Sequence, residues 1–392
     1  MKITMLLSGQ GEIPGAETVA MWRTDPDAVA VWDQAEEAVG PIRPWIDEPV
    51  PSDTLKAQLL SAVGSLATYA VIRRKLGLTP RFVIGHSVGE VAAVGIGLGL
   101  DVATVARFVR ARGQAMLDAI AAGEPMGMRA VVNPPADLDA LVEGCEGVWV
   151  ANRNSARQIV ISGTTAALTA FVEETGVATI PLKVTGAFHT PLMAPAAAAL
   201  RANPEARIPL AHFGPTVIAN RTATAYRPGT DIAGELAEQV VSPVRWADAV
   251  AYAYDHGSQV FLDLSSTGML ARMSDLTGAR HFPVGTPAGI EAAAHELRHV
   301  RTIEGEYDLA AHALGVIVTT KNRQADEALY KETVIPSYQE LRAMAGKPQE
   351  PARILDIVDR VLTIKAVDEE TKVRKLADLR WRADRLADRL AA

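Results

Sequence analysis

The stretch Gly85 to Gly89, which reads Gly-His-Ser-Val-Gly, has the residue types of a nucleophile turn. It joins the segment "RFVI" to the mostly apolar run "VGEVAAVGIGLGL". A short buried strand, a sharp turn and a helix are therefore predicted in that order. Glycines permit a turn that exposes the serine Oγ, and the next helix points its N-terminus at the site. Ser87 is therefore a candidate nucleophile. The alternative is a serine that only caps the following helix.

A serine hydroxyl near its normal pKa is a poor nucleophile, so Ser87 needs a base that accepts its proton. His189, in "VTGAFHTPLMAPA", follows the last of several short predicted strands, and a loop after a strand is a common place for a catalytic side chain. The two residues together predict nucleophilic catalysis by a serine and histidine. The chain has a single cysteine, Cys145, so no internal disulfide is possible. Because no motif surrounds Cys145, it is predicted to be a core residue.

The elements that must position these residues follow an α/β pattern. "KITMLLSGQG" predicts a strand that ends in a glycine turn, and helical periodicity covers residues 53–76 and 101–121. Residues 126–184 change to short units in the order βαββαβ, which is typical of a ferredoxin-like fold. The larger unit resumes with "PTVIANRTATAY", a helix from Asp231 and a strand in "SQVFLDLSS".

The last hundred residues are charged and predicted to be helical, with breaks at Pro336 and at "GKPQEPA". Residues 371–392 place five apolar side chains on one helix face and carry seven Lys or Arg against three Asp, a net charge of +4. These apolar residues are Leu376, Leu379, Ala383, Leu386 and Leu390. The helix either docks an acidic partner or packs its apolar face against the protein or a second subunit.

Composition limits the class of protein. The chain has 392 residues, of which 48% are hydrophobic, which is enough for two or three domains with a sizeable core. The net charge of −7 argues against a nucleic-acid partner. No segment approaches ~18 uninterrupted apolar residues, and the first apolar run is too short for a secretion signal, so we expect a cytoplasmic protein without a membrane partner.

Six motifs resemble one family in order and approximate spacing, over about residues 1 to 290. They are "SGQG", "GHSVGE", "VRARGQAM", "ARQIVISG", "GAFHTPLM" and "EQVVSPVRW". They resemble the malonyl-CoA:acyl-carrier-protein transacylase family, which includes the acyltransferase domains of polyketide synthases. The resemblance implies an α/β fold with an α/β-hydrolase-like large subdomain built on a parallel sheet, over residues 1–125 and 186–295. A ferredoxin-like small subdomain over 126–185 and a C-terminal helical extension over 296–392 complete the prediction.

The resemblance also implies roles for individual residues. Ser87 is expected to accept the acyl group, with His189 as its general base, oriented by the backbone carbonyl of Gln239. The backbone N–H groups of Gln10 and Val88 are expected to stabilise the oxyanion of the tetrahedral intermediate.

Two further positions concern the acyl group. Arg112 falls where the family places the arginine that binds the free carboxylate of a malonyl group, and a guanidinium can hold a carboxylate through two parallel bonds. The alternative is a solvated arginine beside Arg107 and Arg110. Phe188 stands where its ring is expected to crowd an α-substituent, which favours malonyl over methylmalonyl.

Three departures from the family pattern put the substrate in question more than the reaction. Glu12 and Ile13 follow the first glycine turn, where the family usually has "SQ". Gly186 replaces a histidine that polyketide-type members usually carry, and "DLSSTGML" replaces a "GPG" turn near residues 264 to 268.

We therefore predict a ping-pong acyltransferase that moves malonyl, or a related dicarboxylic acyl group, from coenzyme A through Ser87 to the phosphopantetheine thiol of an acyl carrier protein. It is expected to use no metal or bound cofactor and to act in trans, in polyketide or other natural-product synthesis or in fatty-acid synthesis. One alternative is an acyl hydrolase with the same Ser-His pair; such members tend to lack the arginine.

A different enzyme class is suggested by "HELRH", residues 295–299, which matches the H-E-x-x-H pattern of zinc metallopeptidases. Against this alternative, Arg298 places a positive charge beside the second histidine, and no third ligand stands out. The other explanation is a surface helix with two solvated histidines. A docking or scaffold protein with a vestigial Ser-His pair is a third class of function, which none of the motifs suggests.

Overall fold

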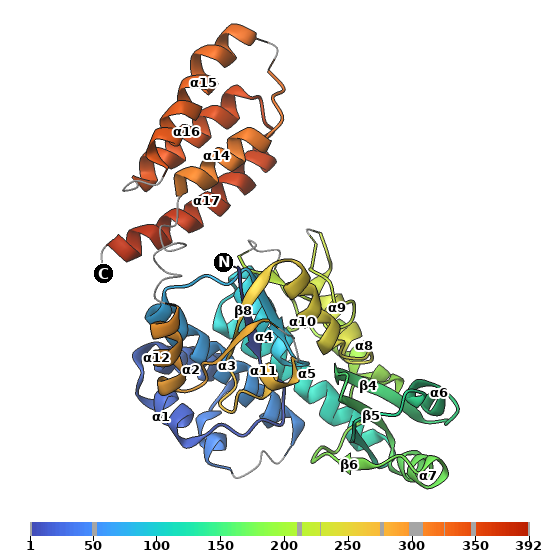
Figure 1. Ribbon diagram of the computed structural model, residues 1–392. Helices are drawn as coiled ribbons and strands as arrows, with labels where there is room; N and C mark the ends of the chain where they lie inside the picture. The colour runs from blue at the N-terminus through green and yellow to red at the C-terminus, as the bar shows by residue number, and fades with distance from the viewer. Residues whose placement is uncertain are drawn as a thin grey trace. The chain divides into compact units, whose positions relative to one another are not determined.

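The computed structural model describes residues 2–48, 53–209, 214–227, 229–274, 278–297, 309–324, 326–345 and 350–390. The chain forms two compact units. The first contains residues 1–211 and 215–298, and the helices of the second lie within residues 299–392 (Figure 1). Each unit has its own hydrophobic core.

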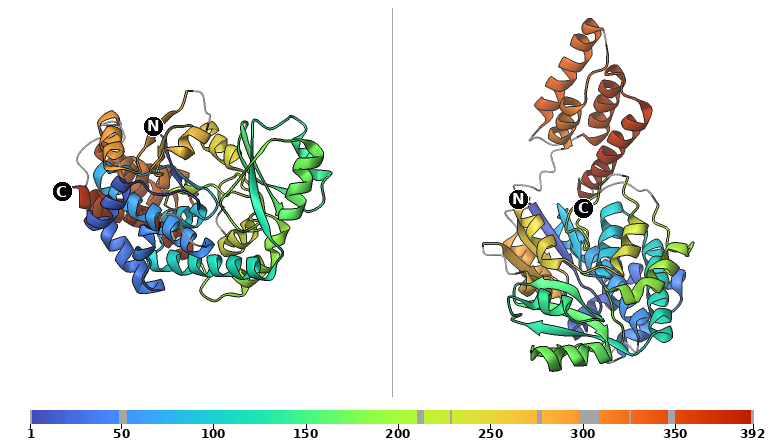
Figure 2. Two further views of the ribbon diagram at one scale, coloured as in Figure 1. Left: turned by 90° about the horizontal axis from the view of Figure 1, so that it is seen from below. Right: turned by 90° about the vertical axis from the view of Figure 1, so that its right-hand side faces the viewer.

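A five-stranded parallel sheet forms the centre of the first unit, in the order β7-β2-β1-β8-β9 (Figures 1 and 2). Its strands are β1 (Lys2–Leu7), β2 (Phe82–Gly85), β7 (Thr216–Val217), β8 (Ser258–Asp263) and β9 (Arg280–Pro283). After Lys2, every residue of β1 is buried, as expected for a central parallel strand covered on both faces. The predicted parallel α/β core is confirmed.

Helices pack on this sheet. On one face, Trp246 and Phe261 belong to a buried apolar cluster that also includes Leu6, Phe82 and Ile84. The helices of this unit, outside the small subdomain, are α1 (Ala16–Thr24), α2 (Pro26–Val39), α3 (Thr54–Leu76), α4 (Gly89–Leu98), α5 (Val102–Ala122), α8 (Ala194–Ala202), α9 (Ile232–Gln239), α10 (Trp246–Asp255), α11 (Met269–Met273) and α12 (Pro287–Glu296). Short 3₁₀ helices cover Arg43–Asp47 and Pro191–Met193.

The inserted subdomain has a separate antiparallel sheet in the order β4-β5-β3-β6. Its elements are β3 (Met126–Val132), α6 (Leu138–Glu143), β4 (Val148–Ser155), β5 (Gln158–Thr164), α7 (Thr165–Thr175) and β6 (Thr179–Pro181). This order is the ferredoxin-like one, as predicted. The last strand is shorter than the sequence suggests, since β6 ends at Pro181, although the N–H of Leu182 still donates to the carbonyl of Met128 at 2.9 Å.

The second unit consists, in its described part, of α14 (Leu309–Thr319), α15 (Glu327–Met344), α16 (Pro351–Ile364) and α17 (Glu369–Leu390). Leu376, Leu379 and Ala383 of α17 are buried in its core, which α14, α15 and α16 complete. The apolar face predicted for residues 371–392 thus packs within its own unit. The side chains of Leu386 and Leu390 lie outside the described residues.

The predicted break at Pro336 is wrong, because α15 continues through that residue. A proline removes one backbone hydrogen bond from a helix, and the packing of Val334 and Leu341 in the core holds both halves of α15 in place. In this helix tertiary packing outweighs the local preference.

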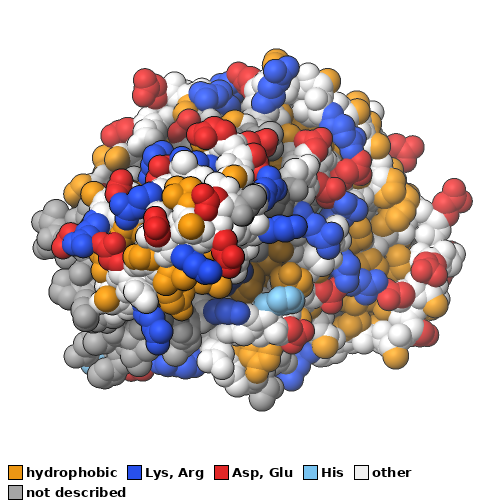
Figure 3. All heavy atoms as spheres, turned by 90° about the horizontal axis from the view of Figure 1, so that it is seen from above, with side chains coloured by type: hydrophobic (Ala, Val, Ile, Leu, Met, Phe, Trp, Pro, Cys, Tyr) orange, Lys and Arg blue, Asp and Glu red, His pale blue; other side chains and the backbone are white. Residues whose placement is uncertain are grey.

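Among the described residues, one helix, α3, is long and apolar enough to cross a membrane by length and composition, and 61% of its most apolar window is buried inside the unit. That burial is typical of a core helix. On the face shown in Figure 3, Lys and Arg side chains are interspersed with Asp and Glu side chains. Mixing of this kind leaves no broad field of one sign on that face.

Leu379→Ala should destabilise the helical unit by about 2–5 kcal/mol, because it leaves a cavity in a fully buried position. Urea unfolding followed by circular dichroism measures the change. Val373→Ala, on the same helix but 52% exposed, is the matched control and should change stability by less than about 0.5 kcal/mol. Equal, small effects of the two substitutions would show that α17 does not depend on this core.

Candidate active site

The turn that carries Ser87 depends on glycines at both ends. β2 ends at Gly85 and α4 begins at Gly89. A Cβ at Gly85 would overlap the backbone of Gly89, and a Cβ at Gly89 would lie 2.5 Å from the carbonyl oxygen of Ser8. Ser87 itself has φ of 52°, in the left-handed region that a nucleophile turn requires. The capping alternative is wrong, because the cap residue of α4 is Val88 and no side chain caps the helix.

Ser87 and His189 are in hydrogen-bond contact. Ser87 Oγ lies 2.8 Å from His189 Nε2, and His189 Nδ1 lies 2.9 Å from the backbone oxygen of Gln239. Since a carbonyl oxygen can only accept, Nδ1 carries the proton and Nε2 is left as the base that faces Ser87. The backbone N–H of His189 also donates to the carbonyl of Val240 at 3.1 Å, which fixes the loop.

The electrostatic environment keeps His189 neutral. Burial is the main cause, followed by the positive charge of Arg112, and together they lower the pKa of His189 to about 3. At neutral pH the imidazole is therefore unprotonated and can accept the proton of Ser87.

Arg112 lies in the same site and is only 1% exposed, so the alternative of a solvated arginine is wrong. Its Nη2 lies 3.4 Å from Ser87 Oγ and donates to Gln239 Oε1 at 3.0 Å, and its Nη1 donates to Gln58 Oε1. Its Nε has no hydrogen-bond partner in the described structure. The neighbouring Arg110 behaves differently, because it forms an ion pair with Glu205 at the surface.

Arg112 makes no direct ion-pair contact among the described residues. Burial lowers the pKa of Arg112 to about 10, and the charge of the nearby Glu90 carboxyl opposes that fall. The hydrogen-bond partners of Arg112 are neutral amides and a hydroxyl. A buried cation whose direct hydrogen-bond partners are all neutral is costly, so the geometry favours an anion as the ligand of this guanidinium.

Gln58, on α3, is a site residue that sequence reasoning missed. It is fully buried, and its Nε2 donates to Thr54 Oγ1 at 2.9 Å while its Oε1 accepts from Arg112. The sequence carried a signal for this role, because Gln58 is a polar residue among the apolar residues of a long predicted helix. A buried side-chain amide needs hydrogen-bond partners.

Asn220 was also missed, and it holds the nucleophile turn together. Its Oδ1 accepts from the backbone N–H of Ser87 at 2.8 Å, and its Nδ2 donates to the carbonyl oxygen of Gly85 at 2.7 Å. Asn220 comes from the loop after β7 and is completely buried. A single asparagine in a loop gives no local sequence signal for this role.

Gln239 contributes both its backbone and its side chain. Its carbonyl orients His189, its Nε2 donates to Ser87 O at 2.8 Å and to Glu90 Oε2 at 2.7 Å, and its Oε1 accepts from Arg112. The sequence predicted the backbone contact alone. The structure brings Ser87, His189, Arg112 and Gln239 together.

The expected oxyanion donors, the N–H groups of Gln10 and Val88, lie on two loops whose backbones are in contact. A Cβ at Gly9 would lie 2.7 Å from the carbonyl oxygen of His86, so the loop that carries Gln10 packs directly on the turn that carries Val88. Thr54 donates to Gln10 Oε1 at 2.8 Å and orients that side chain.

Phe188 is buried, and both its ring and the Ile120 side chain lie close to Gly186. A Cβ at Gly186 would lie 2.7 Å from Phe188 Cζ and 2.9 Å from Ile120 Cδ1, so glycine at 186 makes room for the ring. Phe188 and Gln10 also line a cavity of about 220 Å³, with Trp22, Leu60 and Leu264 among the apolar residues of its wall. Ser87 itself does not line this cavity.

Two of the departures from the family pattern contact each other, namely Glu12 after the first glycine turn and the segment "DLSSTGML" that contains Ser266. Glu12 Oε1 accepts from the backbone N–H of Ser266 at 2.5 Å and from its hydroxyl at 2.9 Å, and Ser8 donates to the other carboxylate oxygen. The loop after β1 is thereby tied to the loop after β8. Glu12 and Ser266 both line the cavity.

The metallopeptidase pattern gains no support from the described residues. α12 ends at Glu296, with His295 in its last turn, and Arg298 and His299 lie outside the described residues. Within the part of the chain that the structure describes, no group of three or more His, Cys, Asp or Glu side chains could hold a metal ion.

A family model for the acyl transferase domain matches residues 5–326. The chain belongs to this family. It is 30% identical over 311 residues to the malonyl CoA-acyl carrier protein transacylase of Mycobacterium tuberculosis, which covers 75% of this chain and 99% of that relative. The match leaves residues 327–392 outside the family model.

Solved structures of the family share the fold. The acyl-carrier-protein-S-malonyltransferase of Bartonella henselae is 26% identical, with a TM-score of 0.69 over 76% of this chain and 99% of that one. The acyltransferase domain from the second module of the salinomycin polyketide synthase is 28% identical, with a TM-score of 0.64. The match covers 75% of this chain and 71% of that one.

Asn220→Ala should destabilise the protein by about 2–5 kcal/mol, because it leaves the N–H of Ser87 and the carbonyl of Gly85 buried without partners. Chemical denaturation measures the loss. Asn203→Ala is the matched control, since its side chain only caps an exposed turn, and it should cost less than about 0.5 kcal/mol. An Asn220→Ala protein as stable as the control would exclude the bracing role of Asn220.

Proposed function

We propose that this member of the acyl transferase family transfers a malonyl group, or a related dicarboxylic acyl group, from coenzyme A to the phosphopantetheine thiol of an acyl carrier protein. The observation that carries the proposal is the buried Arg112, whose direct hydrogen-bond partners among the described residues are all neutral and which lies 3.4 Å from Ser87 Oγ. A free carboxylate on the acyl group would supply the missing anion. The names of the relatives support the same reaction.

In the first half-reaction, Ser87 Oγ attacks the thioester carbonyl carbon while His189 Nε2 accepts the hydroxyl proton. The developing imidazolium is stabilised by the backbone carbonyl of Gln239. The N–H groups of Gln10 and Val88 are the proposed donors to the oxyanion. When the tetrahedral intermediate collapses, the C–S bond breaks and the coenzyme A sulfur takes the proton back from His189.

The second half-reaction runs the same steps in reverse. The carrier-protein thiol gives its proton to His189 and attacks the ester carbonyl, and Ser87 leaves as an alcohol with that proton. A malonyl carboxylate on Arg112 also removes part of the positive charge that holds the pKa of His189 down, so a dicarboxylic acyl group makes the base stronger. An acetyl group lacks this effect.

The proposed reaction needs no resident cofactor, since coenzyme A thioester is the substrate. We propose that the enzyme acts in trans on a separate carrier protein in the cytoplasm, in fatty-acid or polyketide synthesis. Phe188, whose ring lies against Gly186, is the proposed selector against large α-substituents.

Ser87→Ala should abolish covalent loading. Wild-type protein incubated with radiolabelled malonyl-CoA should retain about one label per chain on Ser87, because the ester is an obligatory intermediate. Intact-mass spectrometry and peptide mapping measure the label. Label on Ser87→Ala, or none on the wild type, would overturn the proposed function, and rapid loss of label to water without carrier protein would identify a hydrolase instead.

Arg112→Ala should lower malonyl loading by about 10²–10⁴-fold while acetyl loading is retained or improved, because only malonyl uses the guanidinium. The ratio of kcat/KM for malonyl-CoA and acetyl-CoA measures this selectivity. Arg110→Ala is the matched control on the same helix and should leave the ratio unchanged. Equal losses for both acyl groups would exclude Arg112 as the carboxylate clamp.

A further inference from the structure

Some large apolar side chains of the first unit are exposed to solvent. In its described part they are Ile13, Val132, Ile180, Leu182 and Met269. Three of them, Val132, Ile180 and Leu182, lie on β3 and on the adjoining segment of β6, and they are between 36% and 58% exposed. Single exposed apolar residues are common, whereas a contiguous group of them marks a contact surface. These three residues are named the β6 patch.

The register of the two strands places the β6 patch on one face of the small sheet. Ile180 of β6 stands opposite Ala130 of β3, and directly opposite residues share a face. Val132 lies two residues from Ala130, and Leu182 continues the pairing two residues from Ile180. All three patch side chains therefore point the same way. The helices α6 and α7 cover the opposite face, where Val131 belongs to their apolar core.

The backbone of β6 is not available to a partner strand. β6 is the outer strand of its sheet, and an open edge can pair with a strand of another chain (Figure 1). The N–H of Leu182 points to β3, so the nitrogen of the preceding residue points outward, and that residue is Pro181, which has no N–H. A contact at this edge is therefore made by side chains.

The β6 patch is continuous with the cavity beside the nucleophile. Lys183 follows Leu182 directly and lines the cavity, as does Phe188, the residue before His189. Lys183 is exposed and forms no ion pair within the described part of the chain, whereas Arg153 on β4 is paired with an aspartate. Along this segment an apolar surface is followed by a free positive charge, by the cavity and by the catalytic base.

The proposed acyl acceptor presents its chemistry in the same order. A carrier protein has a protein surface, then the phosphodiester that attaches its arm, then the pantetheine and the thiol. A lysine ammonium binds a phosphate as a point charge. We propose that the β6 patch docks the carrier protein and that Lys183 contacts the phosphodiester, while the pantetheine crosses the cavity to Ser87. This inference rests on the proposed function.

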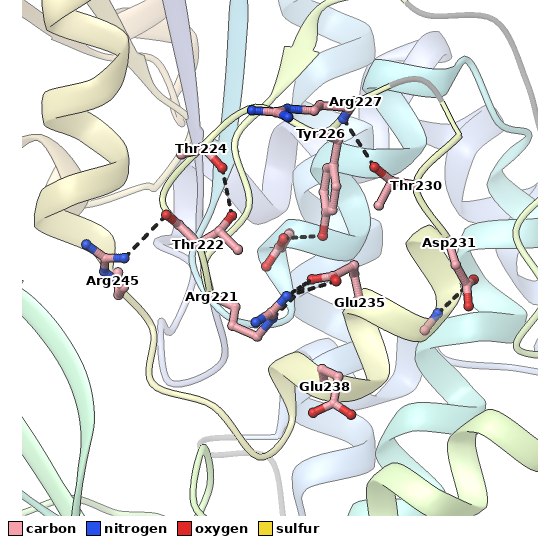
Figure 4. A network of polar contacts seen from close by, with 12 residues as sticks. Arg221, Thr222, Thr224, Tyr226, Arg227, Thr230, Asp231, Glu235, Glu238 and Arg245 are labelled. Carbon is pink, nitrogen blue, oxygen red and sulfur yellow. Dashed lines mark hydrogen bonds and ion pairs between the residues drawn. The ribbon is translucent and has the colours of Figure 1, made fainter.

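The loop after β7 also reaches the nucleophile turn, and its surface is of a different kind. Arg221 is paired with Glu235 at 2.7 Å, and Arg245 donates to the carbonyl of Thr222 at 3.3 Å (Figure 4). Thr224 donates to the hydroxyl of Thr222 at 3.0 Å. These groups already have partners, and covering charged and polar groups costs free energy. An apolar docking contact is therefore favoured at the β6 patch.

Ile180→Asp should raise the KM for carrier protein by about tenfold or more, because docking would have to desolvate the new carboxylate. Transfer from malonyl-CoA to a holo acyl carrier protein of bacterial fatty-acid synthesis measures this. Malonylation of Ser87, and transfer from Ser87 to free pantetheine, involve no carrier protein. Both should keep the wild-type rate, which also shows that the variant is folded. Val318→Asp on α14, where valine is 62% exposed, adds the same charge and should change none of the three rates.

Lys183→Gln tests the phosphate contact. It removes the charge, so the KM for carrier protein should rise by about threefold or more and should depend less on ionic strength. Free pantetheine has no phosphate, and transfer to it should be unchanged. An equal loss with pantetheine would exclude the phosphate contact.

Val132→Asp, on the neighbouring strand, is a second variant of the β6 patch and should act in the same direction as Ile180→Asp. The proposal would be overturned by equal losses in all three reactions, or by an unchanged KM for carrier protein in both variants. A wild type that is dimeric in sedimentation velocity and becomes monomeric with Ile180→Asp would also overturn it, since the patch would then join two copies of the chain. A wild type that acquires no label on Ser87 would instead overturn the proposed function.

Discussion

The guanidinium of Arg112 is the physical constraint on which this site depends. A cation that is 1% exposed must be held by hydrogen bonds, and the fold supplies amide oxygens from Gln58 and Gln239 in place of a carboxylate. Neutral partners hold the side chain without cancelling its charge. The charge remains available to a ligand, and it keeps His189 unprotonated at the same time. Binding of an anionic acyl group and basicity of the histidine are thus coupled through one residue.

The backbone around Ser87 shows how the fold provides room for this arrangement. Gly9, Gly85 and Gly89 lie where two loops from adjacent parallel strands come within contact distance, and a methyl group at any of them would collide with a backbone atom. Strands β1 and β2 end side by side, so both loops emerge at the carboxyl edge of the sheet, where α/β proteins usually bind ligands. Asn220, from the loop after β7, holds the turn through hydrogen bonds to the backbone of Ser87 and Gly85.

Much of the fold and of the candidate site was predictable from the sequence. The reasons why individual predictions succeeded or failed differ from residue to residue. The parallel core followed from continuous apolar runs such as β1, and the small subdomain from the alternation of short strands and helices. Ser87, His189 and Arg112 lie in motifs with strong local signals. Gln58 and Asn220 were missed because their roles arise from contacts between segments up to 135 residues apart, which no local pattern encodes. The helix through Pro336 was mispredicted because packing outweighed a local preference.

The contact between Glu12 and Ser266 limits how the two loops can be exchanged. These residues stand 254 positions apart, yet the carboxylate of one caps the backbone of the other. Loss of the Glu12 carboxylate would leave the Ser266 amide and hydroxyl without this acceptor beside the cavity. The two loops are therefore matched to each other, and a chimera that takes only one of them from another acyltransferase would lose this contact.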